Sequence, residues 1–246
     1  MSSMTTWDHL FSLAVFVIYP SVAWRTYPGV VDRIRTVGEP ARLTEYRLVI
    51  AIWLGFTAML ALMWILLARD WADLGLRWAE PWGLGLGIAL GLGLLWLTNG
   101  QLRKLTASVR DHGQGPAEHV GDLFHFMPTN RRELLWFRAV AVNAGFTEEL
   151  VFRGYLLWYL EPLFGTFWAA LLAAVAFTIG HAYQGLANLP GIAFASVCFV
   201  GLYLLTGSLL VPIVLHAALD IVQGNAFARF AKLIEKAGAP ESQVAD

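Results

Sequence analysis

The chain has 246 residues, of which 57% are hydrophobic and only 14% are charged, and its mean hydropathy is +0.57. Soluble globular domains carry about 25% charged residues, so this chain has too few charges to cover the surface of a soluble protein. The formal net charge of −1 gives no support for general nucleic-acid binding. Cys198 is the single cysteine, which excludes a disulfide within the chain. Composition therefore predicts an integral membrane protein.

Hydrophobic segments recur along the whole chain, and a helix needs about 20 mostly apolar residues to cross a bilayer. The candidate spans are 10–24, 48–67, 82–97, 134–163, 167–181, 191–205 and 209–228. Gly165 and the run Thr206-Gly207-Ser208 predict tight breaks between spans. The third span is rich in glycine, which favours close packing on a neighbouring helix. The sequence thus predicts an all-α, polytopic membrane helix bundle with about seven transmembrane helices, in a single domain over residues 1–246.

Positively charged residues are unevenly distributed between the spans. Arginine and lysine concentrate in 25–47, in 101–132 and in the tail after Ala228, whereas acids offset them between the second and third spans. Positive residues mark the cytoplasmic side. We therefore expect a cytoplasmic carboxyl terminus and an outward amino terminus, in the inner (cytoplasmic) membrane of a bacterium. Both positive connections are expected to be loops, the second with a short surface helix at most, and its histidines to be solvated: His112, His119 and His125.

Residues 134–228 form a 95-residue stretch with only six charged side chains and two histidines. A charge inside a bilayer costs about 2.5–3.5 kcal/mol or more, so a retained one usually faces a polar interior and marks function. We expect two of the six, Arg138 and Glu161, at the membrane interface. The other four and both histidines fall in three runs: Glu148-Glu149-x-x-x-Arg153, Phe177-x-x-x-His181 and His216-x-x-x-Asp220.

The spacing of these runs suits chemistry on a water molecule, because residues four apart share one face of a helix. Glu149 precedes Arg153 by four residues, the favourable order for an ion pair. Glu148 lies about 100° away around the helix and stays free as a general base. The histidines could hold the water or the developing oxyanion. Two neutral imidazoles and a carboxylate, His181, His216 and Glu148, would also suit zinc with an open position for water.

Helix lengths test whether these residues can meet. Glu148 and His181 each lie about 21–22 Å of helix from the break at Gly165, so a hairpin there brings them to one depth. His216 lies only about 13 Å past Gly207. It reaches the same depth only if that turn lies deep or the helix bends, and the sequence leaves this open.

The ordered set of three runs resembles the motifs of the CPBP intramembrane proteases, a family that includes type II CAAX prenyl endopeptidases and bacteriocin-immunity proteins. The resemblance covers about 134–228, which we take as the core that carries the catalytic motifs. It implies a multi-helix membrane fold whose polar cavity opens toward the cytosol. It also implies that Glu148 is the general base, that His181 positions the attacking water, and that Glu149 assists.

The resemblance assigns supporting roles as well. Arg153 and Phe177 would hold the local structure, and His216 and Asp220 would form the oxyanion side of the site. Prenyl endopeptidases commonly have Asn at the last motif position, where this chain has Asp220. An amide can donate to an oxyanion and an ionised carboxylate cannot. Asp220 is therefore protonated by burial, an orienter of a histidine, or a metal ligand. Both a metal-free and a zinc-dependent mechanism stay open.

These patterns predict an intramembrane endopeptidase that acts on a membrane-associated peptide or protein substrate, with zinc as the one cofactor considered and no nucleic-acid partner. No pattern indicates a prenyl pocket, so the substrate class stays open. A non-catalytic membrane scaffold or immunity partner of the same fold is one alternative. A proton-coupled transporter would also keep Glu, His and Asp inside the membrane, but the two matching halves that such a fold favours are not visible.

Overall fold

Helices make up nearly all of the secondary structure in the computed structural model, which describes residues 4–112 and 123–237. The long helices are α2 (Tyr19–Val37), α3 (Glu39–Leu66), α4 (Pro81–His112), α7 (Arg131–Glu149), α8 (Leu157–Gly180), α9 (Leu189–Thr206) and α10 (Leu210–Ala237). The shorter ones are α1 (Thr6–Leu13), α6 (Leu123–Phe126), the π-helices η1 (Ala14–Ile18) and η3 (Leu150–Leu156), and the 3₁₀ helices η2 (Trp71–Leu74), η4 (Ala182–Gln184) and η5 (Leu186–Asn188). Within the described ranges there is no strand, which confirms the all-α prediction.

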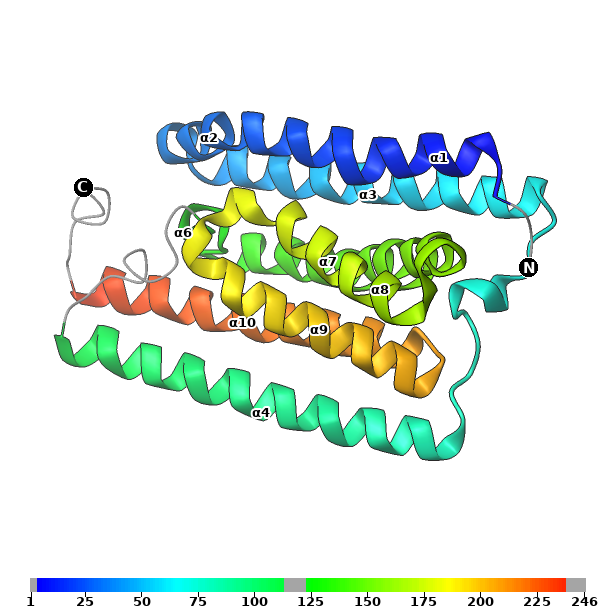
Figure 1. Ribbon diagram of the computed structural model, residues 1–246. Coiled ribbons are helices and arrows are strands. Elements are labelled where there is room, and N and C mark those ends of the chain that lie inside the picture. The colour runs from blue at the N-terminus through cyan, green and yellow to red at the C-terminus, as the bar shows by residue number, and fades with distance from the viewer. Residues whose placement is uncertain (1–3, 113–122, 238–246) are drawn as a thin grey trace.

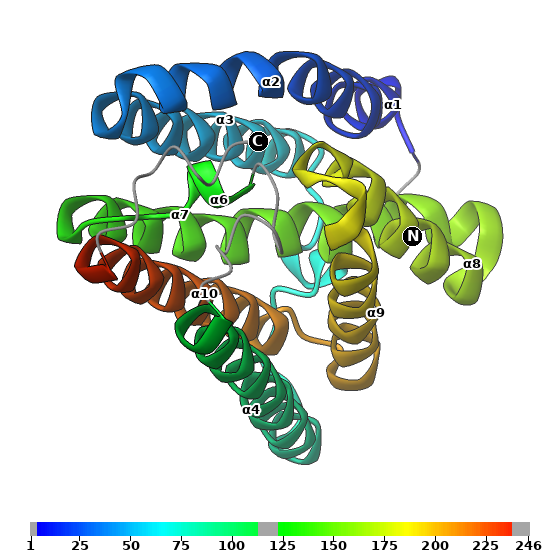
Figure 2. The same ribbon diagram turned by 90° about the vertical axis from the view of Figure 1, so that its left-hand side faces the viewer.

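The long helices lie side by side in layers. α1, α2 and α3 form one outer layer, and α7 and α8 lie beneath it (Figure 1). α9 and α10 follow, and α4 lies on the opposite side of the molecule from α2, as the view in Figure 2 also shows. α7, which carries the start of the first motif, thus lies between α3 and α10.

The number of membrane crossings agrees with the prediction. In the described part of the chain, six helical stretches are long and apolar enough to span a membrane, and one of them, Arg131–Gly180, has 50 residues. Gly165 interrupts this stretch with φ 75° and ψ 162°, a left-handed conformation that glycine adopts without steric cost. The chain reverses there (Figure 1). The stretch therefore supplies two crossings, which gives the predicted total of seven.

The connection between the first two spans is helical, so the prediction of a loop over 25–47 is wrong. α2 continues to Val37 and α3 begins at Glu39, with only Gly38 (φ 75°) between them. The end of α2 is amphipathic, because Val31 and Ile34 are buried while its arginines are exposed. This extension packs on the bundle with one face and keeps its charges in water on the other.

The polar connection before α7 is also more ordered than predicted. α4 continues to His112, and His119 and the side chain of His112 lie outside what the structure describes. The His125 ring accepts a hydrogen bond from Arg35 Nε at 3.0 Å, and its carbonyl accepts one from Arg42 Nε at 2.7 Å. His125 is half-exposed, as a solvated side chain would be, and hydrogen bonds also hold it against α2 and α3.

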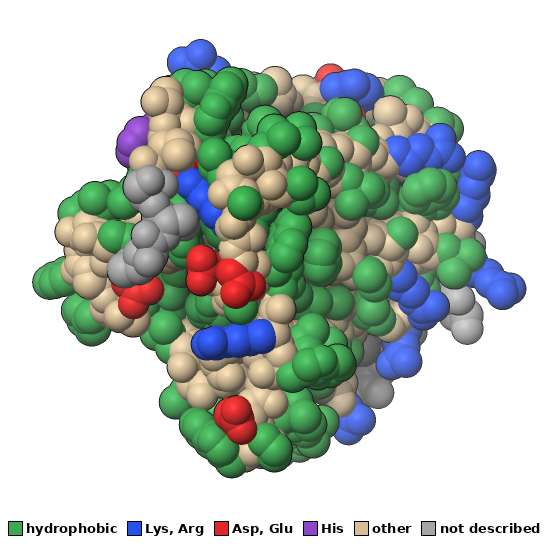
Figure 3. Space-filling model, turned by 90° about the vertical axis from the view of Figure 1, so that its right-hand side faces the viewer, with side chains coloured by type: hydrophobic (Ala, Val, Ile, Leu, Met, Phe, Trp, Pro, Cys, Tyr) green, Lys and Arg blue, Asp and Glu red, His purple; other side chains and the backbone are tan. Residues whose placement is uncertain are grey.

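Charge differs between the two ends of the bundle. The ends of α2, α4 and α10 and the start of α7 lie together (Figure 1). They carry Arg33, Arg35, Arg103, Lys104, Arg131, Arg132 and Arg229. The connections at the opposite end carry Asp70, Asp73, Glu80 and Glu161 beside Arg69 and Arg77. Figure 3 views that end, where several Asp and Glu side chains lie close together among hydrophobic ones.

A glycine lets α7 approach α10 closely. A Cβ at Gly145 would lie 2.8 Å from the backbone nitrogen of Ala217 and 2.9 Å from the carbonyl oxygen of Ile213. Such contacts are too short for any side chain, so only glycine permits this distance between the two helices. The close approach brings Glu149 of α7 within reach of His216 of α10.

The glycine-rich span contributes only in part to such packing. On α4, a Cβ at Gly87 would lie 2.8 Å from Val211 Cγ1, whereas Gly85 and Gly93 have no neighbour within 4 Å. The predicted packing face of α4 therefore involves some of its glycines and not others.

Candidate active site

The first two motifs meet where α7 and α8 face each other. Glu148, in the last turn of α7, is buried, and its Oε2 lies 3.7 Å from Nε2 of His181. This separation is too long for a direct hydrogen bond, and one water molecule could contact both atoms. His181 Nδ1 lies 2.8 Å from the carbonyl oxygen of Phe177, which only accepts, so Nδ1 carries the proton. In the neutral ring, Nε2 then presents its lone pair toward Glu148.

Glu149 joins the first motif to the third. It is fully buried, and its Oε1 accepts hydrogen bonds from Arg153 Nη1 at 3.0 Å and from His216 Nδ1 at 2.8 Å. The predicted ion pair with Arg153 is thus confirmed. His216 Nδ1 carries a proton, because an ionised carboxylate only accepts. His216 Nε2 faces the other way and lies 3.6 Å from Oδ2 of Asp220.

The contact with Glu149 resolves the depth of His216. Ser208 and Leu209, between α9 and α10, are fully buried, and the Leu209 amide donates to the Gly75 carbonyl at 2.9 Å. The turn is therefore packed against the connection that precedes α4. From there, His216 reaches the level of Glu149.

Arg153 is held in part by residues that the motifs do not include. Its Nη2 donates to Ser196 Oγ at 2.9 Å, and Ser196 is fully buried in α9. Its guanidinium lies 4.3 Å from the centre of the Phe177 ring and 5.4 Å from that of Phe199. Phe199 also stacks on His216, with ring centroids 5.1 Å apart. Ser196 could have been noticed in the sequence because it is the one serine of an otherwise apolar span. Nothing in the sequence distinguishes Phe199 from the other apolar residues of that span.

Phe177 lies between the two histidines. Its ring centroid is 4.4 Å from that of His181 and 6.2 Å from that of His216. The π-helix η3 begins directly after Glu149 and contains Arg153. Such wide turns occur often at functional sites. The local backbone and the aromatic ring together fix the directions of the motif side chains.

The two charges expected at the membrane interface lie outside this cluster. Arg138 and Glu161 are both exposed. Arg138 Nη2 donates to Asn225 Oδ1 at 2.7 Å, and Glu161 Oε1 accepts from the Thr166 hydroxyl at 2.6 Å. Neither contact involves a motif residue.

The candidate zinc ligands do not converge. Among the described residues, no three His, Cys, Asp or Glu side chains lie close enough to hold a metal ion. His216 directs Nδ1 to Glu149 and turns Nε2 toward Asp220, so only His181 and Glu148 face each other. Catalytic zinc sites usually have three protein ligands. The donor set therefore does not fit a zinc ion, and we derive no step through one.

A cavity of about 380 Å³ lies away from the motifs, between α4 and α10. Its lining includes Trp96, Asn99, Asn225 and Arg229, and no motif residue. The polar cavity that the family resemblance implies is therefore not this one. Among the motif residues, the rings of Phe177 and Phe199 pack against the Arg153 guanidinium.

Comparison with known proteins agrees with the motifs. Residues 130–222 match the family model described as "Type II CAAX prenyl endopeptidase Rce1-like". No curated protein and no solved structure matches the chain. The matched segment contains all three motifs, and it confirms the resemblance to the CPBP family there. The part of the chain that the structure describes thus has helices long and apolar enough to span a membrane, and its segment 130–222 is similar to type II CAAX prenyl endopeptidases.

Proposed function

We propose that this protein is an intramembrane endopeptidase that hydrolyses a peptide bond of a membrane-associated peptide or protein. The pairing of Glu148 with His181 carries the proposal. Arg153 neutralises Glu149, whereas no Lys or Arg among the described residues forms an ion pair with Glu148. A buried carboxylate that faces a neutral imidazole is suited to accept a proton.

The proposed reaction uses one water molecule held between Glu148 and His181. Glu148 takes a proton from the water as its oxygen attacks the carbonyl carbon of the substrate. The electron pair of the carbonyl bond moves to the carbonyl oxygen, which becomes an oxyanion. When the intermediate collapses, the C–N bond breaks and Glu148 returns its proton to the leaving amine.

The third motif supports this chemistry from the other side. Glu149 holds Nδ1 of His216 and so fixes the direction of its ring. Nε2 is then the nitrogen that can hold or release a proton. Oδ2 of Asp220 lies 3.6 Å from Nε2, too far for a direct hydrogen bond, and one water molecule could contact both atoms.

Charge supports a membrane orientation for this enzyme. The end that carries most arginines includes the end of α10, and the positive-inside rule places that end in the cytoplasm. We therefore propose a cytoplasmic carboxyl terminus, in a bacterial inner membrane. Reporter fusions after residue 246, with one reporter active in the cytoplasm and one active outside, test this orientation.

The function is tested with purified full-length protein and a panel of prenylated, acylated and transmembrane peptides. Wild type is expected to cleave at least one class, and Glu148→Gln is expected to lower the rate about 10²–10⁴-fold. Glu161→Gln is the matched control, because Glu161 is exposed and contacts no motif residue. Equal rates for wild type and Glu148→Gln would contradict the proposal.

The same assay tests whether the hydrolysis proceeds without a metal ion, as we propose. Each reaction is repeated after treatment with a zinc chelator. Glu149 engages Nδ1 of His216, so the motif side chains do not form a three-ligand zinc site. We therefore expect the chelator to change the cleavage rate by less than about twofold. A loss of activity that zinc restores would show that the ligands rearrange to bind it.

A further inference from the structure

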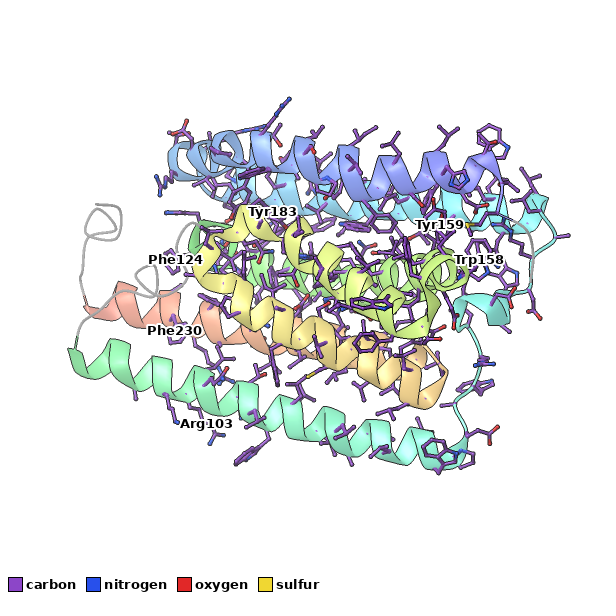
Figure 4. All side chains as sticks on the ribbon, viewed as in Figure 1. Arg103, Phe124, Trp158, Tyr159, Tyr183 and Phe230 are labelled. Carbon is purple, nitrogen blue, oxygen red and sulfur yellow. The ribbon has the colours of Figure 1, made fainter. Side chains whose placement is uncertain are left out.

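Tyr183 lies beside the proposed catalytic pair and belongs to none of the three motifs. It follows His181 by two residues, in η4, which begins the connection from α8 to α9. Its ring stacks on His181, with centroids 6.1 Å apart and planes inclined by 25°. Its ring also meets Tyr27 of α2 edge-on, with centroids 4.9 Å apart. Figure 4 labels Tyr183 between α2 and this connection.

The hydroxyl group of Tyr183 can donate a hydrogen bond. Gln184 Nε2 donates to the phenolic oxygen at 3.2 Å, so that oxygen is the acceptor in its one hydrogen bond. Within the described chain, no acceptor takes the hydrogen of the phenol. A phenol can donate one hydrogen bond while it accepts another.

The position and protonation state of the phenol suit a donor. Burial raises the pKa of Tyr183 to about 12, and the nearby carboxylates of Glu148 and Asp220 add to the rise. The phenol is therefore neutral at neutral pH. The two carboxylates belong to the first and third motifs, so Tyr183 lies close to both halves of the site.

The motif residues themselves offer few donors for an oxyanion. His181 Nδ1 is directed to the Phe177 carbonyl, and His216 Nδ1 to Glu149. The carboxylate of Asp220, when ionised, has no hydrogen to donate. Hydrolysis of a peptide bond nevertheless places negative charge on the carbonyl oxygen, and fixed donors there are often the largest single contribution to the rate.

We propose that the Tyr183 hydroxyl donates a hydrogen bond to the carbonyl oxygen of the scissile peptide bond and stabilises the oxyanion of the tetrahedral intermediate. This inference rests on the proposed hydrolytic function. Tyr183 keeps its proton throughout, because the proton of the attacking water goes to Glu148. The phenol thereby supplies a neutral hydrogen-bond donor. This chain has Asp220 at the motif position where prenyl endopeptidases commonly have the amide of an asparagine.

The test compares Tyr183→Phe with Tyr159→Phe in the peptide-cleavage assay. Tyr159 lies in α8 at the opposite end of the bundle (Figure 4), where its hydroxyl contacts His9 Nδ1 at 2.7 Å. Tyr183→Phe is expected to lower kcat about 100-fold, with KM within about twofold and the melting temperature unchanged. Tyr159→Phe is expected to keep the kcat of wild type.

Three results would overturn the assignment: a Tyr183→Phe kcat within about threefold of wild type, a loss that only follows a lower melting temperature, or an equal loss in Tyr159→Phe. Glu148→Gln in the same assay separates the two proposals. If Glu148→Gln is inactive and Tyr183→Phe is fully active, only the role of Tyr183 fails. If Glu148→Gln cleaves as fast as wild type, the proposed function fails and the role of Tyr183 fails with it.

Discussion

Two buried arginine–carboxylate pairs in this protein differ in how completely their hydrogen bonds are satisfied. One joins Arg69, just after α3, to Asp8 of α1 near the acidic end of the bundle. The other joins Arg153 to Glu149 in the candidate active site. All four side chains are almost fully buried, so each charge depends on the groups around it.

The Arg69–Asp8 pair uses both carboxylate oxygens. Arg69 Nη1 and Nη2 each donate to one oxygen of Asp8 at 2.7 Å, and the backbone and hydroxyl of Thr5 add bonds at 2.8 and 2.9 Å. The guanidinium also lies within 4.9 Å of the ring centres of Trp64 and Trp158. Such a closed set of bonds fastens the amino-terminal helix to the bundle.

The Glu149–Arg153 pair divides its bonds differently. Glu149 receives both of its hydrogen bonds at Oε1, and one comes from a histidine. Glu149 Oε2 and Arg153 Nε are buried without a hydrogen-bond partner in the described structure. An unsatisfied buried group costs about 1–3 kcal/mol. The comparison indicates that the first pair serves stability and that the second accepts a cost in stability in order to orient His216.

Replacing each pair by apolar side chains separates these roles most strongly. Glu149→Leu with Arg153→Met is expected to lower peptide cleavage about 100-fold, because His216 loses the acceptor that fixes its ring. Asp8→Leu with Arg69→Met is expected to leave the cleavage rate per folded molecule within about threefold of wild type. Cleavage is measured on the folded fraction of each purified variant. Equal losses in the two double variants would remove the distinction.

Breaking the Asp8 pair on one side only is expected to lower stability. Arg69→Met leaves the Asp8 carboxylate buried without its cation and should lower the free energy of unfolding by about 3–5 kcal/mol. The control is Arg132→Met, which removes an exposed pair with Glu39 and should cost about 0–1 kcal/mol. Denaturation in detergent micelles measures both. A small effect for Arg69→Met would show that the pair does not fasten the amino-terminal helix.

A smaller effect is expected from packing beside the site. Gly145→Ala forces a Cβ against the backbone of α10 and should cost about 1–3 kcal/mol. Gly85→Ala is the matched helical control, because its Cβ would have no neighbour within 4 Å. The same denaturation assay compares them. If both variants are equally stable, the close approach of α7 to α10 does not depend on glycine.

The candidate site could be predicted in large part because its residues follow helical spacing. Four-residue spacing correctly predicted the Glu149–Arg153 ion pair and the proximity of Phe177 to His181. Counting residues from Gly165 correctly placed Glu148 and His181 at one level. These relations depend on local geometry, which a short stretch of sequence determines.

Contacts between distant segments were not predictable in the same way. Arg69 pairs with Asp8 across 61 residues, and Arg153 contacts Ser196 across 43. The ends of α2 and α4 were also missed, because hydropathy marks the apolar part of a helix and not its polar continuation. The long-range contacts and the helix ends both depend on tertiary packing, which a local sequence pattern does not determine.

The measurement that tests the account most directly is the cleavage rate of Glu148→Gln relative to wild type, on a substrate that the purified protein cleaves. We predict a rate about 10²–10⁴-fold lower, at an unchanged melting temperature and with Glu161→Gln at the rate of wild type. A Glu148→Gln variant that is folded and cleaves at the rate of wild type would contradict the account.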